Sequence, residues 1–69
     1  MRIKINGMKK KIDLKDGKTY LSKVLEAMGY KPNSIVVELN NLIVNSKKWD
    51  EVLLKDGDCI EIVSIVGGG

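Results

Sequence analysis

Residues 55–69 read KDGDCIEIVSIVGGG, so a turn, a strand and three glycines follow one another in a single short segment. The turn is Asp56-Gly57-Asp58, and the strand is predicted over residues 59–64. Successive side chains of a strand point to opposite faces of a sheet, so Ile60 and Ile62 are predicted to face a core. This segment therefore predicts a final strand that continues directly into a glycine tail.

The three glycines have no side chains that could pack against a core, so they are not expected to help the fold. We expect residues 1–64 to form the domain and residues 65–69 to form a flexible tail that carries the terminal carboxylate. The six residues from Ser64 to Gly69, fully extended, span about 20 Å, which is enough to enter a deep active site of another protein. The alternatives are a frayed terminus or a purification remnant.

The composition argues against an enzyme. A chain of 69 residues has room for one small domain and little room for a catalytic pocket. It has no His, the commonest general base, and its single Cys59 can form neither an internal disulfide nor a zinc site of Cys and His. The lone cysteine, the lack of an export signal and the lack of a membrane-length apolar run favour the cytoplasm. No metal, resident cofactor or membrane contact is expected.

The net charge of +3 is unevenly distributed. Residues 1–32 hold nine Lys or Arg and three Asp or Glu, whereas residues 33–69 hold three Lys and six acids. A basic half can attract an acidic partner or nucleic acid, although a solvated lysine-rich face explains the same pattern. The three aromatic residues do not alternate with the basic ones as in a stacking surface, so nucleic acid is not the expected partner.

The first half of the chain predicts a hairpin and then a helix. Residues 2–6 alternate with period two, Asn6-Gly7 is a typical two-residue turn, and residues 8–14 return as a second strand. Apolar residues at helical spacing over 21–28 predict about three turns of helix, with Thr19 as the N-cap and Gly29 at the C-terminal end. The inward side chains are then Ile3, Ile5, Met8, Ile12, Leu14, Leu21, Val24, Leu25 and Met28.

The second half predicts another hairpin, a short helical turn and the final strand. Residues 34–40 and 42–44 are the strands of the hairpin, and Trp49 is predicted to fold back onto the core from the helical turn. One amphipathic helix can cover only one face of a small sheet, and the last strand fits beside the first, parallel to it. The predicted class is therefore α+β, a ubiquitin-like β-grasp in which a five-stranded mixed sheet packs on one main helix. The predicted core is Ile3, Ile5, Ile12, Leu14, Leu21, Val24, Leu25, Val37, Leu39, Ile60 and Ile62.

Residues 37–44 (VELNNLIV), Trp49, residues 54–63 (LKDGDCIEIV) and the final Gly-Gly occur in an order and spacing that resemble the ThiS family of thiamine-pathway sulfur carriers. The resemblance implies a β-grasp fold and a role for the carboxylate of Gly69. A ThiF-like enzyme would adenylate it with ATP, and sulfur from a cysteine desulfurase system would then convert it to a thiocarboxylate. The implied recipient of the sulfur is a ThiG-like thiazole synthase.

Two groups of residues are predicted to contact these enzymes. The resemblance matches Gly67 and Gly68 to the slender tail of the family. Val36, Val63 and Ile65 have the strand parity opposite to the core, so they are predicted to form an apolar docking patch. The predicted partner-binding residues are Gly68, Gly67, Val66, Ile65, Val63 and Val36.

Two other functions stay open on the sequence alone. The chain also resembles the small subunit of molybdopterin synthase, which shares the fold, the terminal Gly-Gly and the activation chemistry of the ThiS family. A β-grasp module that binds RNA or nucleotides through the basic half is an alternative of a different class. A natural stop codon after Gly69 favours a carrier, whereas a continuing chain favours a module.

Overall fold

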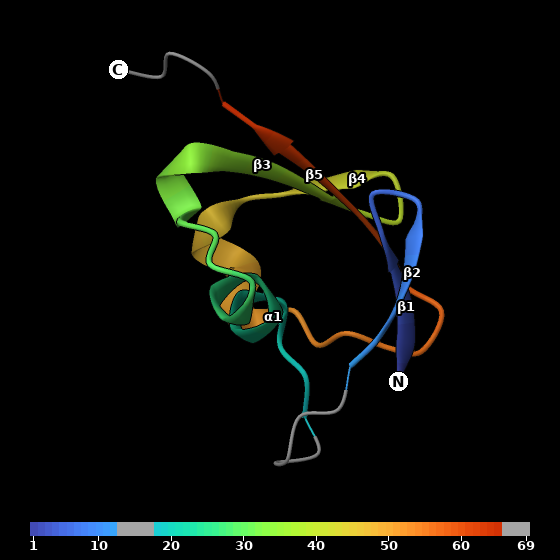
Figure 1. Ribbon diagram of the computed structural model, residues 1–69. Helices are drawn as coiled ribbons and strands as arrows, with labels where there is room; N and C mark the ends of the chain where they lie inside the picture. Colours follow the sequence, from blue (N-terminus) through green and yellow to red (C-terminus); the bar gives the residue numbers. More distant parts are fainter. Residues whose placement is uncertain (13–17, 66–69) are drawn as a thin grey trace.

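The computed structural model describes residues 1–12 and 18–65, which form a sheet with helical segments against one face (Figure 1). Helices α1, η1 and η2 lie on the same side of the sheet, and η1 and η2 are short 3-10 helices. In chain order the elements are β1 (Arg2–Ile5), β2 (Met8–Lys11), α1 (Leu21–Ala27), η1 (Pro32–Ser34), β3 (Ile35–Leu39), β4 (Leu42–Val44), η2 (Ser46–Glu51) and β5 (Cys59–Ser64).

The five strands lie in the order β2-β1-β5-β3-β4. The last strand is therefore the central one, parallel to β1 and antiparallel to β3. Strands β1 and β2 form one antiparallel hairpin and β3 and β4 form the other. The predicted β-grasp topology, including the place of the last strand beside the first, is confirmed.

Asparagine closes both hairpins. Asn6 and Gly7 have φ of 51° and 81°, and Asn40 and Asn41 have φ of 50° and 72°. Two consecutive residues with positive φ are the signature of a type I′ turn, whose twist matches that of the flanking strands. The Asn6 side chain also accepts a hydrogen bond of 2.7 Å from the backbone N–H of Ile62. It thus extends the contact between β1 and β5 beyond the end of β1.

The core lies between the sheet and the helical layer, as predicted. Ile35 and Leu54 are buried although they were absent from the predicted core. Trp49 is buried as predicted, and its Nε1 donates a hydrogen bond to the Val44 carbonyl at 3.0 Å. Ile12 and Leu39 are only half-buried, and Leu14 lies outside the described residues. The buried apolar side chains are Ile3, Ile5, Leu21, Val24, Leu25, Ile35, Val37, Trp49, Leu54, Ile60 and Ile62.

Helix α1 begins differently from the prediction. Its N-cap is Tyr20 rather than Thr19, and no side chain caps it. The N–H of Leu21 instead donates to the carbonyl of Val52 at 2.8 Å, and the buried Thr19 accepts from the N–H of Leu54 at 2.7 Å through its carbonyl. Backbone partners from a distant segment therefore take the place of a side-chain cap.

The C-terminal end of α1 follows the prediction except for Met28. Gly29 has φ of +86°, and the N–H groups of Gly29 and Tyr30 donate to the carbonyls of Glu26 and Leu25, both at 3.0 Å. This pair of bonds is the Schellman motif, which favours glycine at the left-handed position. The helix is seven residues long, so Met28 falls at its C-cap and is 41% exposed instead of buried.

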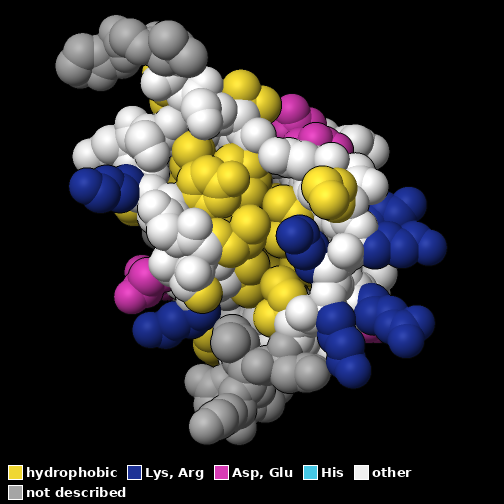
Figure 2. All heavy atoms as spheres, viewed as in Figure 1, with side chains coloured by type: hydrophobic (Ala, Val, Ile, Leu, Met, Phe, Trp, Pro, Cys, Tyr) yellow, Lys and Arg dark blue, Asp and Glu magenta, His cyan; other side chains and the backbone are white. Residues whose placement is uncertain are grey.

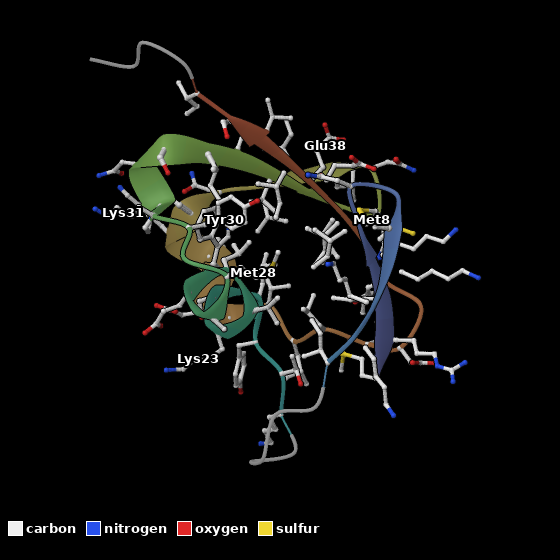
Figure 3. The ribbon with its side chains drawn as sticks, viewed as in Figure 1. Met8, Lys23, Met28, Tyr30, Lys31 and Glu38 are labelled. Carbon is white, nitrogen blue, oxygen red and sulfur yellow. The ribbon has the colours of Figure 1, made fainter. Side chains whose placement is uncertain are left out.

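Strand β2 is the other departure from the predicted burial. Met8 was predicted to face the core, but it is 64% exposed, and all four residues of Met8–Lys11 are exposed. Figure 3 shows Met8 on β2, well apart from α1. Because β2 is an edge strand that no helix covers, its inward-facing side chains meet solvent.

Candidate functional site

The site that the sequence predicts is built where β5 leaves the sheet. β5 runs along β3 as the central strand (Figure 1). Just past its end, the N–H of Ile65 donates to the carbonyl of Ser34 at 2.8 Å. This bond fixes the point from which the tail departs. The predicted tail residues Val66, Gly67, Gly68 and Gly69 lie outside the described residues.

The predicted apolar docking residues lie where they were expected. Val36 and Val63 are directly opposite each other in the pairing of β3 with β5, and they are 38% and 58% exposed. Their strand neighbours Val37 and Ile62 are buried, so the two valines point to the face of the sheet away from α1, here called the outer face. Exposed Ile65 continues the parity of Val63. We call Val36, Val63 and Ile65 the apolar patch.

Two carboxylates follow the apolar patch on the outer face. Glu38 and Glu61 are direct cross-strand partners, two residues from Val36 and Val63 on their strands. Like charges in this position destabilise a sheet. Sequence reasoning did not predict this pair, because its register depends on which strands become neighbours.

The far end of the outer face is basic. Arg2 is opposite Lys11, and Lys4 is opposite Lys9, in the pairing of β1 with β2. All four are exposed, and Figure 2 shows Lys and Arg side chains gathered over these two strands. We call Arg2, Lys4, Lys9 and Lys11 the basic patch. The outer face thus changes from apolar beside the tail to acidic in the middle and basic at the first hairpin.

A hydrogen-bond network fixes the start of β5 and with it the register of the site. The buried carboxylate of Asp58 accepts from Asn40 Nδ2 at 3.0 Å and from the backbone N–H of Lys55 at 2.7 Å. Asn40 Oδ1 in turn accepts from the N–H of Cys59 at 2.9 Å. Because β5 is held at its first residue, Val63 is brought opposite Val36.

Neither a metal centre nor a membrane helix is seen in the part of the chain that the structure describes. No group of three or more His, Cys, Asp or Glu among residues 1–12 and 18–65 is placed to hold a metal ion. No helix formed by these residues is long and apolar enough to cross a membrane.

The family model of the ThiS family matches residues 2–69, which is nearly the whole sequence. The chain belongs to the ThiS family. A ThiS protein of Geobacter metallireducens, described as a thiamine biosynthesis protein, has the same fold in its crystal structure, with a TM-score of 0.82, 27% identity and full coverage of both chains. Its solution structure gives a TM-score of 0.78 at 27% identity and covers all of this chain and 88% of that one.

Two relatives extend the ThiS comparison. An uncharacterized protein, ycf40 of Trieres chinensis, is 41% identical over 49 residues, which are 71% of this chain and 67% of that protein. A thiazole synthase of Magnetococcus marinus is 35% identical over 51 residues, which are 74% of this chain but 16% of that protein. This chain is therefore similar to a minor segment of the thiazole synthase and to most of ycf40.

Proposed function

We propose that this protein is the sulfur carrier for the formation of the thiazole ring in thiamine biosynthesis. The observation that carries the proposal is the match of the ThiS family to residues 2–69, a span that includes the terminal glycines. The similarity to a segment of a thiazole synthase supports the thiazole branch over the molybdopterin branch. The protein is then a substrate of other enzymes rather than a catalyst.

The proposed chemistry takes place at the carboxylate of Gly69. A carboxylate is a poor acyl donor, so an ATP-dependent, ThiF-like enzyme joins it to AMP and releases pyrophosphate. Sulfur that a cysteine desulfurase system supplies at the oxidation level of sulfide then displaces AMP, leaving a thiocarboxylate. A ThiG-like thiazole synthase takes the sulfur from this group, and the carboxylate is regenerated.

The geometry of β5 supports this use of the tail. The last described anchor is the bond of Ile65 to Ser34, and four residues follow it in the sequence. Four residues reach about 13 Å when extended, so the terminal carboxylate can enter a site that the domain cannot. A glycine pair keeps the reacting end narrow, because a Cβ would widen it.

The apolar patch is the surface on which we expect the enzymes to dock. It lies beside the departure point of the tail, and its two valines are exposed although apolar. Clustered exposed apolar side chains often mark an interface. An enzyme seated there would have the tail directed into its active site.

The proposal is tested by intact-mass analysis after incubation with ATP, the adenylating enzyme of the same organism and a sulfur source. We expect an ATP-dependent gain of about 16 Da when sulfur replaces one oxygen of the carboxylate, a difference set by atomic masses and by the acyl-transfer chemistry. Pyrophosphate exchange in the absence of sulfur checks the adenylation step separately. If the folded protein shows neither the mass gain nor pyrophosphate exchange, the carrier function is rejected.

A further inference from the structure

We propose that the basic patch is an electrostatic docking site for an acidic surface on the enzyme that adenylates the tail. The proposal rests on the proposed function, and it concerns how the two proteins meet rather than the chemistry. It assigns a role to Arg2, Lys4, Lys9 and Lys11, which neither the fold nor the tail chemistry requires.

The basic patch is arranged at a cost to the fold. Lys4 faces Lys9 and Arg2 faces Lys11 as direct cross-strand pairs, a placement that destabilises a sheet through charge repulsion. No carboxylate of the described residues forms an ion pair with any of the four side chains. Asp56 offsets the charge only at one end, where its Oδ1 accepts from the backbone N–H of Arg2 at 2.6 Å. The patch therefore has charge available for a partner.

The basic patch also has a hollow in which an acidic side chain can be received. Arg2, Lys4 and Lys9 line it with Ile3, Gly57 and Cys59, and its volume is about 290 Å³. Gly57 lies in the turn before β5, and Cys59 is the first residue of β5. The hollow therefore extends from the basic patch to the central strand. A carboxylate there would meet three cationic side chains.

The basic and apolar patches are close enough for a single partner to cover both. Cys59 is level with Lys4 in the pairing of β5 with β1, and Val63 lies four residues further along β5. At about 3.3 Å per residue, this is a separation of about 13 Å along one continuous face. A standard interface buries about 800 Å² per partner, equivalent to a disc of about 16 Å radius. An enzyme centred on the apolar patch therefore reaches the level of Lys4, and an interface centred between the two patches covers both.

An acidic protein surface fits the basic patch better than nucleic acid does. Strands that bind nucleic acid combine basic residues with aromatic stacking platforms, and none of the four strand residues of β1 or β2 is aromatic. Glu38 and Glu61 follow on the same face, so they would repel the continuous phosphate backbone of a nucleic acid, whereas a protein can present its acidic side chains to the basic patch alone. Charge complementarity between proteins mainly accelerates association, so the patch is expected to act on the association rate.

The test compares two double variants with the same change in net charge. Lys4→Glu/Lys9→Glu leaves the basic patch with two positive and two negative charges, and positions 4 and 9 remain a like-charge pair across the strands. Lys23→Glu/Lys47→Glu is the control, because both lysines are exposed and lie in α1 and η2, away from the outer face (Lys23 is labelled in Figure 3). Thermal melts establish that each variant is folded. Lys9→Glu alone, which creates an opposite-charge pair, serves as a second patch variant.

The measurement is the association rate with fluorescently labelled adenylating enzyme of the same organism, by stopped flow at low and high salt. At about 50 mM NaCl we expect the patch variant to associate on the order of tenfold more slowly than the control. At about 0.5 M NaCl the difference should fall below about twofold, because salt screens exposed charges. Dissociation rates should change little.

Each outcome decides the proposal. Equal association rates of the patch variant and the control, with wild type adenylated normally, overturn the docking site and leave the carrier function standing. Wild type that is not adenylated at all rejects the carrier function and the docking site together. RNA binding is measured with a 20-nucleotide RNA at about 150 mM salt. If wild type and the control bind this RNA and the patch variant does not, the basic patch is reassigned to nucleic acid. No RNA binding, with the expected rate difference, supports the proposal.

Discussion

Asparagine has two roles in the turn between β3 and β4: it adopts positive φ, and its side chain anchors β5. Asn40 and Asn41 both adopt positive φ between β3 and β4. Only Asn40 also forms side-chain bonds, to the buried Asp58 and to the N–H of Cys59. The conformation of the turn and the anchoring of β5 can therefore be tested independently at neighbouring positions.

We predict that Asn40→Gly lowers the free energy of unfolding by about 1–3 kcal/mol, because it leaves a buried carboxylate oxygen short of a donor. Glycine keeps the backbone conformation, so the loss reports the side-chain bonds. Asn41→Gly is the control, and it should change stability by less than about 0.5 kcal/mol. Urea unfolding measures both. Equal effects of the two substitutions would show that the side-chain bonds of Asn40 contribute nothing measurable to the free energy of unfolding.

We predict that Lys9→Glu stabilises the free protein by about 0.2–1 kcal/mol, because it replaces a repulsive pair with Lys4 by an attractive one. The gain should shrink at about 1 M NaCl, where charges interact over about 3 Å. Lys47→Glu has no cross-strand cation opposite and is the matched control. Thermal melts at two salt concentrations make the comparison. A loss of stability that persists at high salt contradicts this account of the basic patch.

The burial of single residues is predicted well where the helical layer covers the sheet, and poorly at the edge of the sheet and at the end of the helix. Ile3 and Ile62 are buried as their alternation predicts, since the sheet has a covered face there. Met8 and Met28 have the correct parity or helical spacing and are nevertheless exposed, because β2 lies at the edge of the sheet and Met28 is the C-cap at the very end of α1. Periodicity identifies the face of an element, but the extent of the neighbouring layer decides whether that face is covered.

At the scale of elements, local turn chemistry explains which features could be predicted. Asn6-Gly7, Asn40-Asn41 and Gly29 specify their conformations from within the turn, so both hairpins and the end of α1 were located correctly. No local pattern predicts a structure for residues 52–54, although Leu54 is buried and backbone bonds join this segment to the start of α1. Those bonds link segments over 30 residues apart, which no local pattern reveals. Thr19 was wrongly assigned as the N-cap for the same reason.

The pairing of β3 with β5 makes the docking role of the apolar patch testable. We predict that Val63→Glu weakens binding of the adenylating enzyme on the order of tenfold or more, since it buries a charge in an apolar contact. Stability should fall by about 1 kcal/mol or less, because Val63 is outside the core. Binding is measured by titration calorimetry.

Leu42→Glu provides the control for the apolar patch. Leu42 is 73% exposed on the edge strand β4 and belongs to neither patch. The substitution introduces the same charge and removes an exposed apolar side chain. We expect it to bind the enzyme as wild type does. If both variants lose affinity equally, net charge rather than the apolar patch explains the effect.

At the scale of the whole molecule, folding and sulfur chemistry should be separable. We predict that deletion of Gly69 leaves the melting temperature unchanged, because the buried core extends no further along β5 than Ile62. It should nevertheless abolish thiocarboxylate formation, since the new terminal carboxylate stands about 3.5 Å short of its position. A misplacement of 1 Å can already lower a rate on the order of a hundredfold. Melting curves and intact-mass analysis give the two readouts.

Gly68→Val tests the width of the tail instead of its length. We expect normal melting and strongly reduced adenylation, because a branched side chain obstructs a narrow enzyme channel. Pyrophosphate exchange gives the rate. Normal thiocarboxylate formation by either tail variant would mean that the terminal glycines are not the working group.

The central position of β5 has a consequence for the synthesis of the protein. Until residues 59–64 emerge from the ribosome, the sheet consists of two separate hairpins, β1–β2 and β3–β4, with the middle strand missing. Isolated two-stranded hairpins are marginally stable in water at best. The nascent chain therefore completes its sheet only when its last strand arrives. An enzyme that recognises the outer surface of that strand meets finished molecules and leaves incomplete ones unmodified.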